Sequence, residues 1–198
     1  MFIAFCGIDG SGKSTHMKAI LDWLHTQGVK AISHKVIFEE VDHIAKEYEK
    51  KEKDMFSLKS KSLLYAYEVC KASNQIQRWL DENYTVLLDR WTYSHWAYAY
   101  AYGIENKELN DILEQCLVPD MVFLFHLPVD EALKRIQQRG IEGVNETKFI
   151  MNKACEKYNV LGSKKNFIHM NSLDTFDYNQ QVIKDHVNSF VCKAGIKR

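Results

Sequence analysis

One segment near the N-terminus restricts the fold and chemistry of this chain more than any other. Residues 7–14 read Gly-Ile-Asp-Gly-Ser-Gly-Lys-Ser. They match the pattern G-x-x-x-x-G-K-[ST], whose glycines let the backbone curl so that its N–H groups surround an anion. An apolar run, Phe2–Cys6, precedes the segment, and apolar residues at helical spacing follow it. A glycine-rich turn that merely links two elements would require neither neighbour, so the sequence predicts a strand, a phosphate-binding loop and a helix in succession.

The side chains of this loop indicate which anion it binds. Lys13 places a positive charge beside the outer phosphates of a nucleotide, and the hydroxyl of Ser14 completes the ligand set of a magnesium ion. We therefore expect a nucleoside triphosphate, ATP with Mg²⁺, to be held by the loop. The loop residues assigned to this contact are Gly7, Asp9, Gly10, Ser11, Gly12, Lys13 and Ser14.

Apolar runs and helical periods alternate along the rest of the chain. We expect strands at residues 2–6, 31–38, 85–88, 121–125 and 167–170, and helices at residues 14–25, 39–54, 58–80, 129–138 and 180–190. This alternation predicts a three-layer α/β fold, a single domain over residues 1–198 whose central parallel sheet carries helices on both faces. In such a fold, ligands bind beyond the carboxyl ends of the strands.

A second polar pair follows the strand expected at residues 85–88. Asp89 ends this strand, in the position from which such folds place a carboxylate beside the magnesium ion. The planar guanidinium of Arg90 suits a phosphate. Because this pair and the phosphate loop both follow strand ends, we expect them to share one site. An ordinary surface ion pair is the alternative interpretation of the two residues.

Composition argues against several classes of protein. The 26 basic and 26 acidic residues balance, whereas a general binder of nucleic acid or of membrane surfaces normally carries a basic excess. The five cysteines form no C-x-x-C pair, and no apolar run reaches the roughly 18 residues that a membrane span needs. We expect a cytoplasmic protein that acts on small-molecule nucleotides, without nucleic-acid or membrane partners.

Residues 89–98, Asp-Arg-Trp-Thr-Tyr-Ser-His-Trp-Ala-Tyr, resemble the DR-x3-S-x2-A-Y signature of the thymidylate kinases. The loop from Ile8 to Thr15 is similar to that of the family, as are residues 119–124, residues 129–135 and the later Arg139-Gly140 pair. The matches follow the family's order over most of the chain. The resemblance implies an ATP- and magnesium-dependent nucleoside monophosphate kinase that converts dTMP to dTDP, with a homodimer as a possible assembly.

The resemblance also implies roles for individual residues. Arg90 would grip the 5′-phosphate of the acceptor, and Asp9 would lie between the donor and acceptor phosphates. Tyr98 would fill the space of a 2′-hydroxyl and so favour deoxyribose. Arg135 and Arg139 would border a lid near residues 136–152 that closes over ATP. The implied catalytic set is Lys13, Asp9, Asp89, Arg90 and Arg139, with Thr15 added to the ATP contacts and Ser94 and Tyr67 to the acceptor contacts.

The chain departs from the family pattern where the acceptor base is read. Val69 stands where the family usually has an arginine, Ala99 replaces a glutamine, and residues 34–40 lack the usual proline and arginine. Two other functions therefore stay open. A deoxynucleoside kinase would use Glu39 or Glu40 as the base that takes a proton from a sugar hydroxyl. A regulatory protein would bind ATP and act through a partner.

Overall fold

The computed structural model describes residues 1–36, 57–138 and 147–194, and within them it has one five-stranded sheet. The strands are β1 (Phe2–Gly7), β2 (Ala31–Lys35), β3 (Thr85–Asp89), β4 (Met121–His126) and β5 (Phe167–Asn171). They lie in the order β2-β3-β1-β4-β5, and all the pairings are parallel. The expected α/β fold with a central parallel sheet is confirmed.

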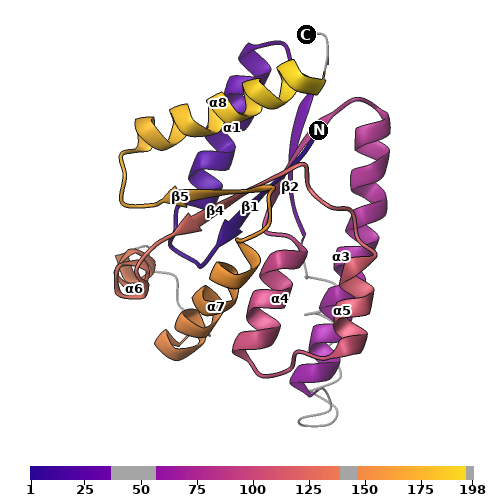
Figure 1. Cartoon of the computed structure of the whole chain (residues 1–198), viewed down its shortest axis with the longest axis vertical. Coiled ribbons are helices and arrows are strands. Elements are labelled where there is room, and N and C mark those ends of the chain that lie inside the picture. Colours follow the sequence, from indigo (N-terminus) through magenta and orange to yellow (C-terminus); the bar gives the residue numbers. More distant parts are fainter. Residues whose placement is uncertain (37–56, 139–146, 195–198) are drawn as a thin grey trace.

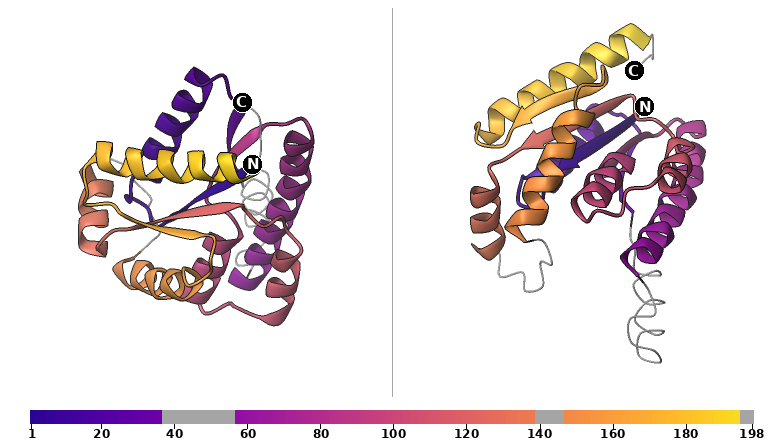
Figure 2. Two further views of the ribbon diagram at one scale, coloured as in Figure 1. Left: turned by 45° about the horizontal axis from the view of Figure 1, so that its top comes forward. Right: turned by 60° about the horizontal axis from the view of Figure 1, so that its bottom comes forward.

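Helices cover both faces of this sheet. In the described part of the chain they are α1 (Lys13–Thr26), α3 (Leu58–Asp81), α4 (Thr92–Ala101), α5 (Lys107–Glu114), α6 (Val129–Gln138), α7 (Lys148–Leu161) and α8 (Phe176–Ala194). Helices α1 and α8 lie on one face, and α3, α4, α5 and α7 lie on the other (Figure 1). The right-hand view of Figure 2 shows the same layers, with α8 above the sheet and α7, α4 and α3 below it.

Alternating side chains of the strands fill two separate cores. Phe2, Ala4 and Cys6 of β1 point into the core that contains residues of α3, α4, α5 and α7. Ile3 and Phe5 point into the opposite core, which contains apolar residues of α1 and α8. All six residues of β1 are buried, as expected for the central strand of a parallel sheet covered on both faces. The strand that leads into the phosphate loop is therefore held rigidly.

The register of the sheet brings several strand ends together. Phe5 pairs with Asp89, and Lys35 also pairs with Asp89, so β2 and β3 end beside the start of the phosphate loop. On the other side, Gly7 pairs with Phe125 near the end of β4. Asp89-Arg90 and the loop therefore lie at the same edge, as the sequence indicated.

The expected elements match the structure with identifiable exceptions. The helix at residues 129–138 has the expected bounds, but α8 begins four residues before residue 180. Strand β2 ends at Lys35 instead of extending to residue 38; residues 37–38 and the helix expected at 39–54 lie outside the described residues.

Helices α4, α5 and α7 are not among the elements that the sequence pattern predicts. Helix α4 is so rich in aromatic residues that its sequence shows no clear alternation of apolar and polar residues at helical spacing. The short α5 is capped at its N-terminus by Asn106, whose side chain accepts a hydrogen bond from the backbone N–H of Leu109. Among the described helices, none has the length and apolar character needed to cross a membrane.

Candidate active site

The glycines of the loop adopt conformations that other residues rarely can. Gly10 and Gly12 have φ values of 80° and 86°, in the left-handed region. A Cβ atom on Gly10 would lie 2.8 Å from the carbonyl oxygen of Ala132 in α6, and one on Gly7 would lie 2.5 Å from that of Phe125. Glycine is therefore required both for the curl of the loop and for its close packing against β4 and α6.

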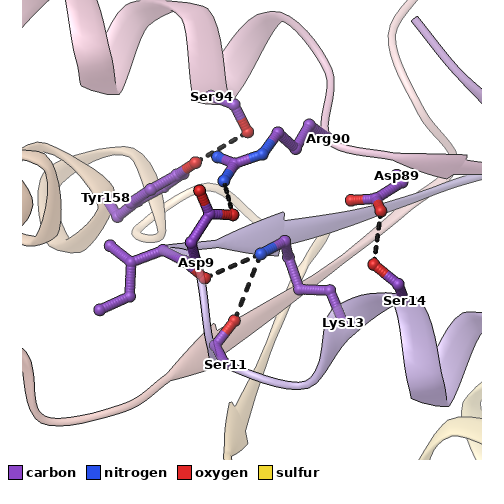
Figure 3. A network of polar contacts seen from close by, with 9 residues as sticks. Asp9, Ser11, Lys13, Ser14, Asp89, Arg90, Ser94 and Tyr158 are labelled. Atoms are coloured by element: carbon purple, nitrogen blue, oxygen red, sulfur yellow. Dashed lines mark hydrogen bonds and ion pairs between the residues drawn. The ribbon is translucent and has the colours of Figure 1, made fainter. Parts of the chain in front are cut away.

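Lys13 folds back over the loop that it follows. Its Nζ donates a hydrogen bond to the carbonyl oxygen of Ile8 at 2.8 Å and lies 3.5 Å from Ser11 Oγ (Figure 3). Burial, reinforced by the charge of Arg90, lowers the pKa of Lys13 to about 8, against the opposing pull of Asp9 and Asp89. At neutral pH the ammonium group is mostly protonated, so it is a cation at the centre of the anion nest.

Ser14 and Asp89 meet across the edge of the sheet. Ser14 Oγ donates a hydrogen bond to Asp89 Oδ2 at 2.6 Å (Figure 3), and the Asp89 side chain is buried at the end of β3. A hydroxyl and a carboxylate side by side are the oxygen ligands that Mg²⁺ prefers. The chemistry of this pair therefore fits the magnesium ion that the sequence implies.

Arg90 is held in an unusual backbone conformation. Its φ is 70°, a left-handed value that costs a residue other than glycine about 1–3 kcal/mol and is found mostly at functional sites. The Arg90 N–H donates to the carbonyl oxygen of Phe5 at 2.9 Å. Its guanidinium pairs with Asp9 Oδ1 at 2.5 Å and lies 5.2 Å from the centre of the Tyr98 ring.

Asp9 stands among several cations. Partial desolvation would raise its pKa, but the charges of Arg90, Lys13 and Lys35 outweigh that effect, and the pKa of Asp9 lies below its ordinary value. The carboxylate therefore stays ionised near neutral pH. All three basic residues lie close enough to Asp9 to act on its charge.

A cavity of about 690 Å³ opens beside this cluster. Its volume lies within the range of roughly 300–1,000 Å³ that small-ligand pockets occupy. The sequence-assigned residues Asp9, Asp89, Arg90, Ser94 and Tyr98 all line it. Its other lining residues include Lys35, Lys61, Ser62, Tyr65, Trp91, His95 and Tyr102. We call this space the acceptor cavity.

The contacts of His95 in the acceptor cavity determine which of its ring nitrogens carries the proton. Its Nε2 lies 3.1 Å from the carbonyl oxygen of Ser62 and 3.2 Å from Ser62 Oγ. A carbonyl oxygen accepts hydrogen bonds and cannot donate them, so Nε2 carries the proton and Nδ1 is an acceptor. Burial lowers the pKa of His95 to about 4, so the ring is neutral. Val69, which the resemblance aligns with the family's arginine, also lines this cavity.

Several assigned residues lie away from the acceptor cavity or outside the described chain. Tyr67 is 62% exposed and is absent from the cavity lining, to which Tyr65 contributes instead. Thr15 is exposed in the first turn of α1. Arg135 contacts Glu131 Oε1 at 3.1 Å and the carbonyl oxygen of Ser172 at 3.4 Å. Arg139 and much of the expected lid lie outside the described residues.

Tyr158 is a buried residue of the site that the sequence pattern did not single out. Its hydroxyl donates a hydrogen bond to Ser94 Oγ at 2.7 Å, which ties α7 to α4 beside Arg90 (Figure 3). Burial raises its pKa, so Tyr158 stays a neutral donor. The sequence did contain a signal for this helix, because residues at helical spacing are apolar and are buried in the structure: Met151, Ala154 and Tyr158.

These features define a phosphotransferase of the P-loop class. They are the glycine loop, the buried Lys13 and the Ser14–Asp89 pair, which lie at one edge of a parallel sheet beside a basic cavity. Sequence comparison then narrows the class. The family model described as thymidylate kinase matches residues 5–183, and the chain belongs to that family. It is thus an enzyme, a nucleoside monophosphate kinase.

Curated relatives carry the same description. A probable thymidylate kinase of Methanocaldococcus jannaschii is 32% identical over 168 residues, which cover 85% of each chain. A probable thymidylate kinase of Thermococcus kodakarensis is 29% identical over 171 residues, with 80% of this chain and 82% of the relative covered. That of Sulfurisphaera tokodaii is 28% identical over 179 residues, with 89% and 90% covered.

Proposed function

We propose that this enzyme transfers the γ-phosphoryl group of ATP to dTMP, forming dTDP and ADP. An oxygen of the acceptor's 5′-phosphate attacks the γ-phosphorus, and the bond from that phosphorus to the β–γ bridging oxygen breaks. The observation that carries the proposal is the position of Arg90, whose guanidinium lines the acceptor cavity and pairs with Asp9 beside the phosphate loop. A cation so placed suits an acceptor that already carries a phosphate.

On the donor side, the chain acts by positioning and by neutralising charge. The left-handed glycines Gly10 and Gly12 aim backbone N–H groups at the phosphates, and Lys13 adds a cation. Ser14 and Asp89 would hold Mg²⁺, which when bound supplies further neutralisation of the phosphate oxygens. In-line transfer demands little covalent chemistry of the protein, so fixed charges at fixed positions account for most of the catalysis.

On the acceptor side, three residues support dTMP in particular. Arg90 binds the 5′-phosphate, and Tyr98, beneath its guanidinium, would exclude a 2′-hydroxyl. The neutral His95, whose Nδ1 can accept a hydrogen bond, lines the same cavity as Val69. An acceptor nitrogen suits the N–H of thymine. The relatives named as probable thymidylate kinases support the same base.

A nucleoside kinase needs a carboxylate base beside the acceptor, and the described lining of the cavity offers only Asp9 and Asp89. The bases suggested from the sequence, Glu39 and Glu40, lie outside the described residues. Within the cavity lining, Asp9 is paired with Arg90 and Asp89 with Ser14. A role as an ATP-binding regulator is less supported, because a separate acceptor cavity adjoins the donor loop. The lid bordered by Arg135 and Arg139, a homodimer and a cytoplasmic location remain part of the proposal.

An acceptor panel tests this function. Purified enzyme with Mg²⁺ and ATP is offered dTMP, dUMP, dCMP, UMP and thymidine, and ADP release is followed by a coupled assay. We expect dTMP to give the highest kcat/KM. Turnover of thymidine with none of dTMP would refute the monophosphate kinase assignment. Lys13→Ala, assayed in parallel, excludes a contaminating kinase.

A further inference from the structure

Two cysteine side chains from distant parts of the sequence meet where α3 and α5 lie side by side (Figures 1 and 2). The Sγ atom of Cys70, on α3, lies 3.4 Å from that of Cys116, which follows α5. Both thiols also approach the carbonyl oxygen of Ile112, at 3.8 and 3.9 Å. The sulfur atoms of a disulfide are about 2.05 Å apart, so a bond would require them to approach by only about 1.4 Å.

The two thiols differ in their access to solvent. Cys70 is half-buried, whereas Cys116 is buried. Burial, reinforced by the neighbouring thiol of Cys70, raises the pKa of Cys116 to about 12, so the Cys116 thiol stays protonated near neutral pH. A dissolved reagent would therefore react first with Cys70, and Cys116 is placed to react second with the product.

The segment that carries Cys116 is hydrogen-bonded to the wall of the acceptor cavity. The carbonyl oxygen of the next residue, Leu117, accepts a hydrogen bond from Trp91 Nε1 at 2.8 Å. The N–H of Leu117 donates to Ser73 Oγ of α3 at 2.9 Å. Trp91 lines the cavity and directly follows Arg90. A displacement of Cys116 would therefore be passed to the indole next to the arginine of the acceptor site.

Cys70 belongs to a second part of the cavity wall. It directly follows Val69, which lines the cavity from α3. Three further lining residues come from the same helix: Lys61, Ser62 and Tyr65. A bond between Cys70 and Cys116 would join this helix to the segment that holds Trp91 and would shift one part of the wall against the other. A misplacement of about 1 Å in a substrate site is enough to reduce activity substantially.

We propose that Cys70 and Cys116 form a reversible disulfide bond whose formation shifts the wall of the acceptor cavity and weakens acceptor binding. The inference rests on the proposed function, because that function assigns the cavity to the acceptor. The oxidant is a low-molecular-weight disulfide, and a low-molecular-weight thiol reverses the reaction. The kinase would thus lose activity when its surroundings become oxidising and regain it when they become reducing.

The bond forms by two successive exchanges. The Cys70 thiolate attacks one sulfur of the small disulfide, whose S–S bond breaks and releases one thiol. The Cys116 sulfur then gives up its proton to solvent and attacks the Cys70 sulfur of the mixed disulfide, which releases the second thiol. The two cysteines lose two electrons in total, and these electrons reduce the small disulfide to two thiols. Because Cys116 must be deprotonated, the second exchange is the slow step at neutral pH.

The test compares enzyme incubated with oxidised glutathione and enzyme incubated with dithiothreitol. After oxidation, peptide mapping without reduction should find Cys70 linked to Cys116. KM for dTMP should rise about fivefold, and MgATP affinity, measured by calorimetry without acceptor, should stay within about twofold of the reduced enzyme, because the phosphate loop lies on other elements. Dithiothreitol added afterwards should restore the original KM.

Three variants complete the test. Cys70→Ser, at a half-buried position that tolerates a hydroxyl, should keep the kinetics of the reduced parent with either reagent. Cys116→Ala should stop at a mixed disulfide on Cys70, which intact mass detects. Cys192→Ser is the matched control, because Cys192 is an exposed cysteine on α8, and this variant should respond to oxidation like the parent.

Two results would overturn the proposal. One is the absence of a link between Cys70 and Cys116 in the parent after oxidation. The other is a complete link with an unchanged KM for dTMP. Failure of the proposed function would look different, because the reduced enzyme would then not phosphorylate dTMP, whereas the link would still be found by peptide mapping.

Discussion

Replacing Arg90 by lysine is the sharpest test of how the acceptor is bound. Lysine keeps the positive charge and the left-handed backbone strain, because neither residue is glycine. What it loses is the fork of the guanidinium, which can donate two parallel hydrogen bonds to a phosphate. The buried end of β3 and the hydrogen bond from the residue 90 N–H to Phe5 are retained, so the fold should be unaffected.

The size of the effect follows from the hydrogen bond that lysine cannot make. One hydrogen bond to a charged group contributes about 1.5–3 kcal/mol. The Arg90 side chain is 22% exposed, so solvent screening is modest. Without one such bond to the acceptor phosphate, kcat/KM for dTMP should fall by about 10- to 150-fold. KM for ATP should change by less than about threefold, because the proposed mechanism places the donor phosphates against Lys13 and the glycine loop instead.

Steady-state kinetics with each substrate varied in turn measure both effects. Arg78→Lys is a suitable control, since Arg78 is exposed near the end of α3 and is absent from the cavity lining. It should leave every constant unchanged. An Arg90→Lys effect confined to ATP would refute the acceptor role, because Arg90 would then act on the donor phosphates or on Asp89.

Two further variants probe the donor cation and the sugar. Lys13→Ala should abolish transfer and leave the melting temperature within a few degrees of the parent; near-normal activity would contradict the phosphate-loop assignment. Because burial lowers the Lys13 pKa to about 8, ATP affinity should fall as pH rises through 8. The bound phosphates favour the ammonium form, so binding near pH 8.5 should take up a proton, which calorimetry in two buffers of different ionisation enthalpy detects. Tyr98→Ala should narrow the preference for dUMP over UMP, and equal rates with both acceptors in the parent would contradict a 2′-selective Tyr98.

The parts of the site that lie close together in sequence could be predicted from it. The glycine loop, Lys13 and Ser14 form one continuous motif, and Asp89-Arg90 follows an apolar strand directly. Parallel pairing of β1 and β3 then brings these two segments to one edge without further information. The local motifs, together with the rule that parallel strands end at the same edge of a sheet, were enough to predict this part of the site.

Face assignment on α3 shows where the sequence interpretation fell short. Successive residues of a helix are about 100° apart around its axis, so Tyr65 and Tyr67 are separated by about 200° and face opposite ways. Val69 is four residues after Tyr65 and shares its face, and both line the acceptor cavity. Placing Val69 at the acceptor therefore favours Tyr65 over Tyr67, a deduction that the sequence alone permitted.

Other contacts depend on tertiary packing and left no local signal. The hydrogen bond from Tyr158 to Ser94 joins residues 64 positions apart, and that from Gln180 to His16 joins residues 164 positions apart. Neither pair belongs to a motif. The left-handed conformation of Arg90 was equally hidden, because nothing in the residue type favours a positive φ.

The central claim, transfer to a phosphate rather than to a sugar hydroxyl, is tested most directly by competition. The enzyme is given equal concentrations of dTMP and thymidine with Mg²⁺ and ATP labelled in the γ-phosphate, and the labelled products are separated by chromatography. We predict that the label appears in dTDP and that no labelled dTMP forms. Labelled dTMP without labelled dTDP would show that the acceptor is the nucleoside, and it would contradict the roles assigned to Arg90 and the acceptor cavity.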